Sequence, residues 1–179
     1  MADLRQLTRR FPHAGRVQGI YLRPSRGVPA VSVAAAVAIA GRGLAGDRGC
    51  EKDGGPRTGH KRQVTLMQAE HVPLIAGWIG QERIDPASFR RNLHVGGINL
   101  LAARKLFADQ PVRIAIGRDV VLVVTGPCDP CSKMEDALGA GAYNAMRGHG
   151  GLTAEIATGG TIAVDDEVRV FAGEDMIEG

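Results

Sequence analysis

Short β-prone segments, separated by glycine and proline, run through most of the chain and constrain its fold more than any other feature. They are rich in β-branched and other apolar residues and lie at positions 16–22, 31–39, 63–67, 93–95, 112–116, 120–125, 153–157 and 167–171. Short strands at this spacing are typical of a barrel or a sandwich, whereas repeated βαβ units need long helical segments between strands. The pattern therefore predicts a mainly β fold.

The segments 112–116 and 120–125 are joined only by Gly117, Arg118 and Asp119. A short polar connection that contains glycine is typical of a tight turn between antiparallel strands. We expect a β-hairpin here.

Helical patterns are few. Residues 68–79 place apolar side chains at helical spacing, although Pro73 fits such a helix only in its first turn. Asp85 followed by Pro86 is typical of an N-cap and a first helical position, which predicts a short helix through residue 90. Further short helical turns are expected at 132–138 and 142–146, and the loop 48–61 is expected to be mobile.

Composition limits the class of protein. With 179 residues, 44% of them hydrophobic, the chain is predicted to form one domain over residues 1–179. The formal charge of +3 is mild and the aromatic residues are only four Phe, two Tyr and one Trp, so nucleic acid is not an expected partner.

The longest apolar stretch, residues 28–40, is short for a membrane span, and the N-terminus lacks the apolar core of a secretory signal. No membrane association is therefore expected. Three cysteines are too sparse for a secreted disulfide scaffold, which favours a cytoplasmic location.

Two of those cysteines lie in the turn Cys128-Asp129-Pro130-Cys131, where they are candidate metal ligands or nucleophiles. A thioredoxin-like site is disfavoured, because the surrounding elements are predicted to be antiparallel. A structural zinc site would need further ligands such as Cys50, His60 or His149. A single reactive thiolate that carries persulfide sulfur or ligates a metal, and a pair of purely structural thiols, both remain open.

Two other segments carry groups suited to chemistry. FRRNL at residues 89–93 places two guanidinium groups and an amide at a helix end, a set of donors suited to an oxyanion or a phosphate, although a solvated basic helix end has the same pattern. GLAGDR at residues 43–48 is a glycine-framed turn with an acid beside a base, which also fits an ordinary loop.

Taken in order, these and other motifs resemble those of the MOSC domain, which is found at the C-terminus of molybdenum cofactor sulfurases and in stand-alone bacterial proteins. Six ordered motifs are far more specific than one C-x-x-C. The resemblance spans residues 15–170, and its motifs are GLAGDR (43–48), RQVTL (62–66), FRRNL (89–93), GINL (97–100), PCSK (130–133), and GGTI (159–162) with DEV (166–168).

The resemblance implies an irregular closed β-barrel with a few short helices and a pocket for the molybdenum cofactor (molybdopterin), a pterin dithiolene with a phosphate tail. Cys131 matches the family's cysteine and would ligate molybdenum or carry sulfane sulfur. No pyridoxal-phosphate domain accompanies the motifs in this chain, in contrast to the sulfurases.

The same resemblance implies which residues bind the cofactor. Arg90 and Asn92 match an Arg-x-Asn motif and would hold the pterin or its phosphate. Arg48 and Lys133 would add positive charge that favours the thiolate form of the cysteine. Asp47 completes the matched Gly-Asp-Arg turn and is included in the predicted site.

For function, the resemblance implies an oxidoreductase that reduces small N-hydroxylated substrates such as amidoximes, hydroxylamines and N-hydroxylated bases. Its electrons would come from an external reductase. The alternative is a carrier of persulfide sulfur or of the cofactor, which delivers its cargo to a molybdoenzyme or sulfurase partner.

Three positions depart from the family's pattern. Gly49 stands where the family has histidine, so no imidazole is expected at that corner. Arg91 replaces a frequent acidic residue, and Asp165 stands where Gly-Asp is usual. We expect the last two changes to affect turns and surface charge.

Overall fold

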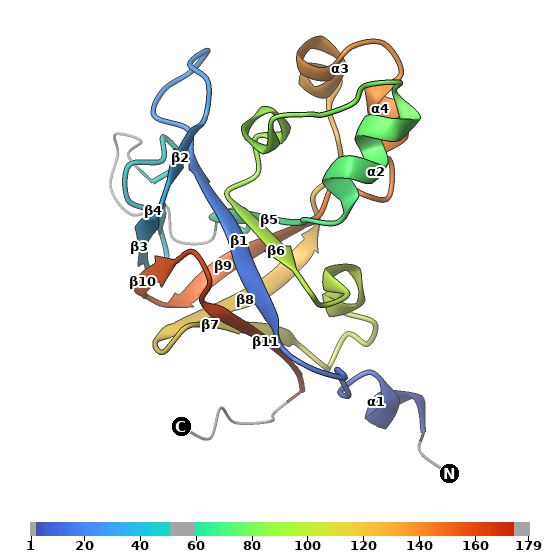
Figure 1. Ribbon diagram of the computed structural model, residues 1–179. Coiled ribbons are helices and arrows are strands. Elements are labelled where there is room, and N and C mark those ends of the chain that lie inside the picture. Colours follow the sequence, from blue (N-terminus) through green and yellow to red (C-terminus); the bar gives the residue numbers. More distant parts are fainter. Residues whose placement is uncertain (1–2, 51–59, 174–179) are drawn as a thin grey trace.

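The computed structural model describes residues 3–50 and 60–173, so most of the loop predicted at 48–61 lies outside the described residues. Seven strands form a closed barrel, because the first and last strands of the order also pair with each other (Figure 1). In order around the barrel they are β11 (Glu167–Ala172), β7 (Val112–Ile116), β8 (Val120–Pro127), β9 (Leu152–Thr158), β5 (Val64–Gln68), β6 (Leu93–Gly96) and β1 (Gly15–Leu22).

Neighbouring barrel strands are antiparallel, except that β5 and β6 run parallel. The predicted closed barrel and the predicted hairpin of β7 and β8 are therefore confirmed.

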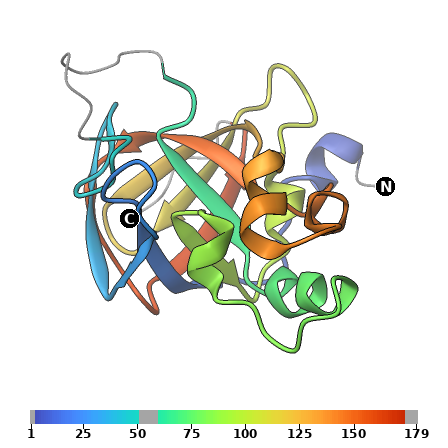
Figure 2. The ribbon, with the colours of Figure 1, turned by 90° about the horizontal axis from the view of Figure 1, so that it is seen from above.

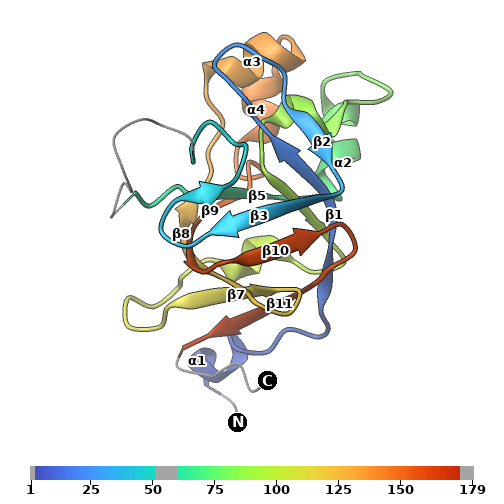
Figure 3. The same ribbon diagram turned by 90° about the vertical axis from the view of Figure 1, so that its left-hand side faces the viewer.

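A smaller sheet lies beside the barrel and contains β10 (Gly160–Ala163), β3 (Ala35–Ile39) and β4 (Gly43–Leu44) (Figure 3). The segment 31–39, expected to be one strand, is two: β2 (Val31–Val33) pairs with β1, and β3 pairs with β10 and β4. The break falls at residue 34 because the two halves pair with different sheets. Strands β4 and β10 were not expected, since short glycine-containing segments carry little strand propensity of their own.

Helices α2 (His71–Trp78), α3 (Ser132–Leu138) and α4 (Ala142–Met146) gather at one end of the barrel with the 3₁₀ helix η1 (Pro86–Phe89), while α1 (Leu4–Leu7) lies at the other end (Figures 1 and 2). All four predicted helical segments are confirmed, with Pro73 in the first turn of α2. Helix α1 and the 3₁₀ helix η2 (Leu100–Ala103) were not expected. None of the described helices is long and apolar enough to cross a membrane.

The barrel wall separates two apolar cores. Leu66 and Leu93 point into the barrel, whereas Met67 packs with Phe89 and the helices outside it. Because both faces of β5 and β6 are covered, every residue of these two strands is buried. The second core fixes η1 and α3 to the barrel, and these elements flank the cysteine turn.

The barrel closes over a short seam, where β1 meets β11 at two residue pairs, Gly15 with Val168 and Arg16 with Glu167. A Cβ atom on Gly15 would stand 2.5 Å from Cγ2 of Ile98 and 2.7 Å from the carbonyl oxygen of Gly96. Only glycine allows the chain to pass this closely.

We expect Gly15→Ala to lower the free energy of unfolding by about 1–3 kcal/mol, since neighbouring backbone must move to admit the methyl group. The matched control is Gly77→Ala in α2, where an added Cβ meets nothing within 4 Å. That change should stabilise the protein by about 0.5–1 kcal/mol. Denaturant unfolding of both variants tests the pair, and a neutral Gly15→Ala would contradict the tight seam.

Candidate functional site

A cavity of about 280 Å³ lies between the segments that leave β1, lead into β5 and β6, and begin α3. Among the described residues that line it, six are cationic and none is acidic. A cavity lined by one sign of charge favours a ligand of the opposite sign. The lining residues are Arg23, Arg48, Gly49, His60, Arg62, Arg90, Arg91, Cys131, Lys133 and Met134.

The cavity brings together four of the six residues that the sequence nominated, namely Cys131, Arg48, Arg90 and Lys133. The other two, Asp47 and Asn92, are buried in the wall beside it. Sequence reasoning missed Arg23, an isolated arginine outside the motifs, and assigned no site role to Arg62, although Arg62 begins the RQVTL motif.

The nominated cations differ from the other arginines of the cavity, which all have a hydrogen-bond partner among the described residues. Within the described ranges, the side chains of Arg48, Arg90 and Lys133 make no hydrogen bond or ion pair. Arg23 and Arg62, in contrast, each contact another side chain. Three unpaired cations in one cavity are available to an anionic ligand.

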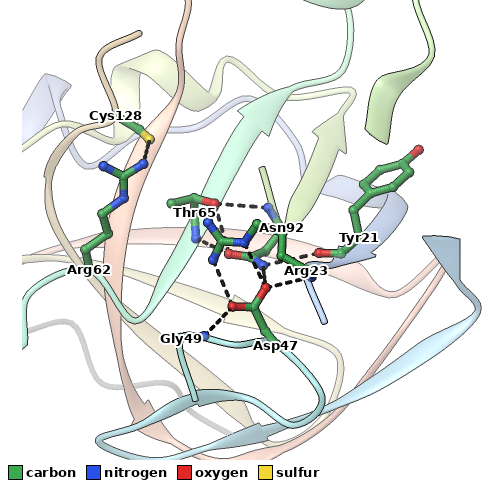
Figure 4. A network of polar contacts seen from close by, with 8 residues as sticks. All are labelled: Tyr21, Arg23, Asp47, Gly49, Arg62, Thr65, Asn92 and Cys128. Atoms are coloured by element: carbon green, nitrogen blue, oxygen red, sulfur yellow. Dashed lines mark hydrogen bonds and ion pairs between the residues drawn. The ribbon is translucent and has the colours of Figure 1, made fainter. Parts of the chain in front are cut away.

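Asp47 is the centre of a buried polar network (Figure 4). The Arg23 guanidinium donates to both of its carboxylate oxygens at 2.9 Å, and the backbone N–H of Gly49 donates at 2.8 Å. Burial by itself raises the pKa of Asp47, but the hydrogen bonds and charge of Arg23 outweigh it and leave the pKa lowered. Gly49, which stands where the family has histidine, contacts Asp47 through its backbone N–H, so this contact needs no imidazole side chain.

Asn92 joins this network to two strands, β1 and β5. Its Nδ2 donates to Asp47 Oδ2 at 2.9 Å and to the carbonyl oxygen of Tyr21 at 3.2 Å. Its Oδ1 accepts from the backbone N–H and the hydroxyl of Thr65 at 3.1 and 2.9 Å. Both donors and both acceptor positions of the carboxamide are therefore used within the protein. Asn92 positions the turn that carries Asp47, and its predicted contact with a cofactor remains a prediction.

Arg90 ends η1 in the left-handed conformation, with φ of 58°. A residue with a side chain costs about 1 kcal/mol or more in this region. The turn separates three consecutive side chains: Arg90 enters the cavity, Arg91 passes beneath the cysteine turn, and Asn92 enters the barrel wall. The strained backbone conformation of Arg90 thus lies at the point where the side chains of residues 90–92 turn in three different directions.

Arg91 is 3% exposed, so the expectation that it affects surface charge is wrong. Its guanidinium donates to the carbonyl oxygens of Gly150 at 2.7 Å, Phe89 at 3.0 Å and Cys128 at 3.1 Å. These bonds fix the cysteine turn against η1 and the start of β9, a role that an acidic side chain cannot fill. Burial, together with the charge of Arg91, lowers the pKa of His94 to about 4, which keeps that imidazole neutral at pH 7.

The two cysteines of the turn have different surroundings. Cys128 is 1% exposed, and its Sγ accepts a hydrogen bond from Nη2 of Arg62 at 3.2 Å (Figure 4). Cys131 is exposed, lies directly before α3 and lines the cavity. Only Cys131 is thus open to a ligand in the cavity.

Of the alternative zinc ligands, His60 lines the same cavity as Cys131, whereas Cys50 and His149 do not. Cys50 is buried near Gly43, and the ring of His149 packs against His71 and Trp78. No cluster of three or more His, Cys, Asp or Glu suited to a metal ion exists in the part of the chain that the structure describes. The strand before the turn pairs in antiparallel fashion with both neighbours, unlike the βαβ setting of a thioredoxin site.

A model of the MOSC domain matches residues 53–169, which is more than half of the chain. The protein belongs to the MOSC domain family. Solved structures with the same fold include the YuaD protein of Bacillus subtilis, with 20% identity, a TM-score of 0.74, and coverage of 93% of this chain and 100% of that one.

YiiM of Geobacillus stearothermophilus is 15% identical, with a TM-score of 0.63 and coverage of 92% of this chain and 77% of that one. YiiM of Escherichia coli is 18% identical, with a TM-score of 0.59 and coverage of 87% and 69%. A search among curated proteins gave no match.

We expect Asp47→Asn to lower the free energy of unfolding by about 3 kcal/mol at pH 7, because it leaves the mostly buried Arg23 without its counter-ion. Since the folded pKa of Asp47 is lowered, its stabilisation is present above the ordinary value of 3.8 and is lost as pH falls through the folded value. Denaturant unfolding at several pH values should show the difference between wild type and variant shrinking below about pH 3.8. A difference that stays constant down to pH 2 would contradict this role.

Proposed function

We propose that this MOSC protein binds the molybdenum cofactor in the cationic cavity and reduces the N–O bond of small N-hydroxylated compounds. The observation that carries the proposal is one exposed thiol, Cys131, in a cavity with three cations that have no partner among the described residues. This combination offers a soft sulfur donor and an anion site within one small volume.

The donors fit the chemistry of the cofactor. A phosphate tail needs fixed cations, and Arg90 and Arg48 present guanidinium groups that can bind it in bidentate fashion. Lys133 adds a third charge two residues after the thiol. Cys131 would ligate the metal through its thiolate, the ligand type that suits a metal already held by dithiolene sulfurs.

The reaction is a two-electron reduction. When bound, the cofactor supplies the redox centre, and the protein supplies its ligand, its charge balance and the substrate cavity. The N–OH group takes up two electrons and two protons, its N–O bond breaks, and the products are an N–H group and water. The electrons would come from an external reductase, which is the proposed partner.

The proposal predicts that the two cysteines are not equivalent. In protein purified from a cofactor-competent host, Cys131→Ser should abolish N–O reductase turnover, because a hydroxyl is a harder and weaker ligand than a thiolate. Cys128→Ser should retain molybdenum and most of the turnover, since this thiol is buried away from the cavity. The measurements are molybdenum content and reduction of an amidoxime with an artificial electron donor.

The same samples distinguish an enzyme from a sulfur carrier. A carrier would release one cyanide-reactive sulfur per Cys131 and would leave N-hydroxylated substrates unchanged however much reductant is supplied. Single release with no reduction of three different N–O substrates, in molybdenum-replete protein, would refute the enzyme. Equal loss of metal in both cysteine variants would instead indicate a paired-cysteine site.

Arg90 provides a test of cofactor retention. Arg90→Ala should weaken binding of the cofactor by about 1.5–3 kcal/mol, the range for a hydrogen bond to a charged group. Arg90→Lys should restore little, because an ammonium group cannot reproduce the guanidinium fork. Arg118→Ala, an exposed arginine in the turn between β7 and β8, is the matched control. Pterin and molybdenum content of the purified variants give the result, and full retention in Arg90→Ala would remove this residue from the cofactor site.

A further inference from the structure

Helix α2 shows an uncharged face to solvent. Residues 71–81 contain no Asp, Glu, Lys or Arg, whereas a surface helix ordinarily has charged or polar side chains on its outer face. Its inner face is already covered, because Ile75 and Ala76 pack in the second core. The exposed residues of the outer face are Pro73, Leu74, Gly77 and Trp78. An apolar surface of this kind is typical of an interface with another molecule.

We propose that the outer face of α2 binds the same face of a second copy of this chain, which gives a dimer with two-fold symmetry. A two-fold interface brings identical surfaces together. Each copy must therefore offer both a protruding side chain and the recess that receives it, and charges of both signs if it offers any. The outer face of α2 and its two ends meet these conditions.

The shape of the face is self-complementary. Trp78 protrudes, with 53% of its surface exposed, and it is the single tryptophan of the protein. Gly77 and Gly80 lie beside it, and a Cβ atom on either glycine would meet no described atom within 4 Å. In an antiparallel pairing centred near Gly77, the indole ring of each copy lies over the glycines of the other. Tryptophan is among the residue types that most often dominate the binding energy of an interface.

The charges at the two ends of α2 are complementary as well. Glu70 directly precedes the helix, and Arg83 follows it beyond the turn at Gly80; both are exposed. The carboxylate of Glu70 accepts the backbone N–H of Gly97 at 2.6 Å, so its charge is fixed at the helix start. Antiparallel pairing brings Glu70 of one copy to Arg83 of the other, and symmetry forms this ion pair twice. The same arrangement opposes the two helix dipoles.

A dimer of this kind leaves the cationic cavity open. Helix α2 lies on the side of the molecule opposite to β4 and the turn that carries Arg48 (Figures 1 and 2). None of residues 71–83 lines the cavity. Dimerisation through α2 is thus independent of the reaction proposed above, and each copy keeps its own site.

The test measures association and the surroundings of Trp78 in the same samples. Analytical ultracentrifugation of the full-length protein covers about 1 to 200 µM, the range in which small interfaces associate. We expect the mass to rise from one chain to two. Over the same range the tryptophan emission should shift to shorter wavelength, because the indole ring leaves water. With one tryptophan in the protein, this signal reports only on the face of α2.

Leu74→Glu should weaken association at least about tenfold, because it buries an unpaired carboxylate of each copy in the interface. Leu106→Glu is the matched control, since Leu106 is 62% exposed and lies outside α2. This control should associate as wild type does.

A second variant tests the ion pairs at the rim. Arg83→Glu places an acid opposite Glu70 and should weaken association about threefold to tenfold at low salt, with a smaller loss at high salt. Arg118→Glu makes the same change in the exposed turn between β7 and β8 and should have no effect.

Protein that stays monomeric up to about 200 µM would assign the face to a different partner and overturn the dimer. A dimer that forms without a shift of the Trp78 emission, or that persists unchanged in Leu74→Glu, would associate through another surface. Either result would equally overturn the assignment to α2.

Discussion

The buried carboxylate of Asp47 is the interaction on which the rest of the site depends. It accepts two hydrogen bonds from the Arg23 guanidinium, and through Asn92 it is linked to the backbone of two strands, β1 and β5. A buried charge is tolerated only when it is paired and hydrogen-bonded, so the turn around Asp47 cannot move independently of the barrel. Arg48, the next residue, is thereby held at the cavity, where its guanidinium has no partner in the part of the chain that the structure describes.

The segment 90–92 likewise combines side chains that bond within the protein with one that lines the cavity. Arg91 and Asn92 form their hydrogen bonds within the protein, whereas the Arg90 guanidinium lines the cavity without a partner among the described residues. The left-handed backbone at Arg90 makes this arrangement possible, because it turns the side chains of adjacent residues in different directions.

Most of the fold could be predicted from the sequence, because apolar segments broken by glycine and proline encode strands locally. The errors in the strands have a common cause, because the split of the segment 31–39 and the strand β10 both arise from pairing in the smaller sheet. Pairing between distant segments leaves little trace in either segment alone. Closure of the barrel at Gly15 is equally non-local, since it depends on how near Ile98 and Gly96 come.

The sequence by itself determined the kind of residues that the site contains, a thiol after a strand and several basic side chains in ordered motifs. Only the tertiary structure decided their surroundings. Cys131 is exposed and Cys128 is buried, while Asp47 and Asn92 are hydrogen-bonded within the wall and Arg90 has no partner within residues 3–50 and 60–173. The tertiary structure also placed Arg91 in the interior and left Trp78 exposed on α2. The physical reason is that burial and hydrogen-bond partners come from segments far apart in the chain, so identical side chains acquire different roles.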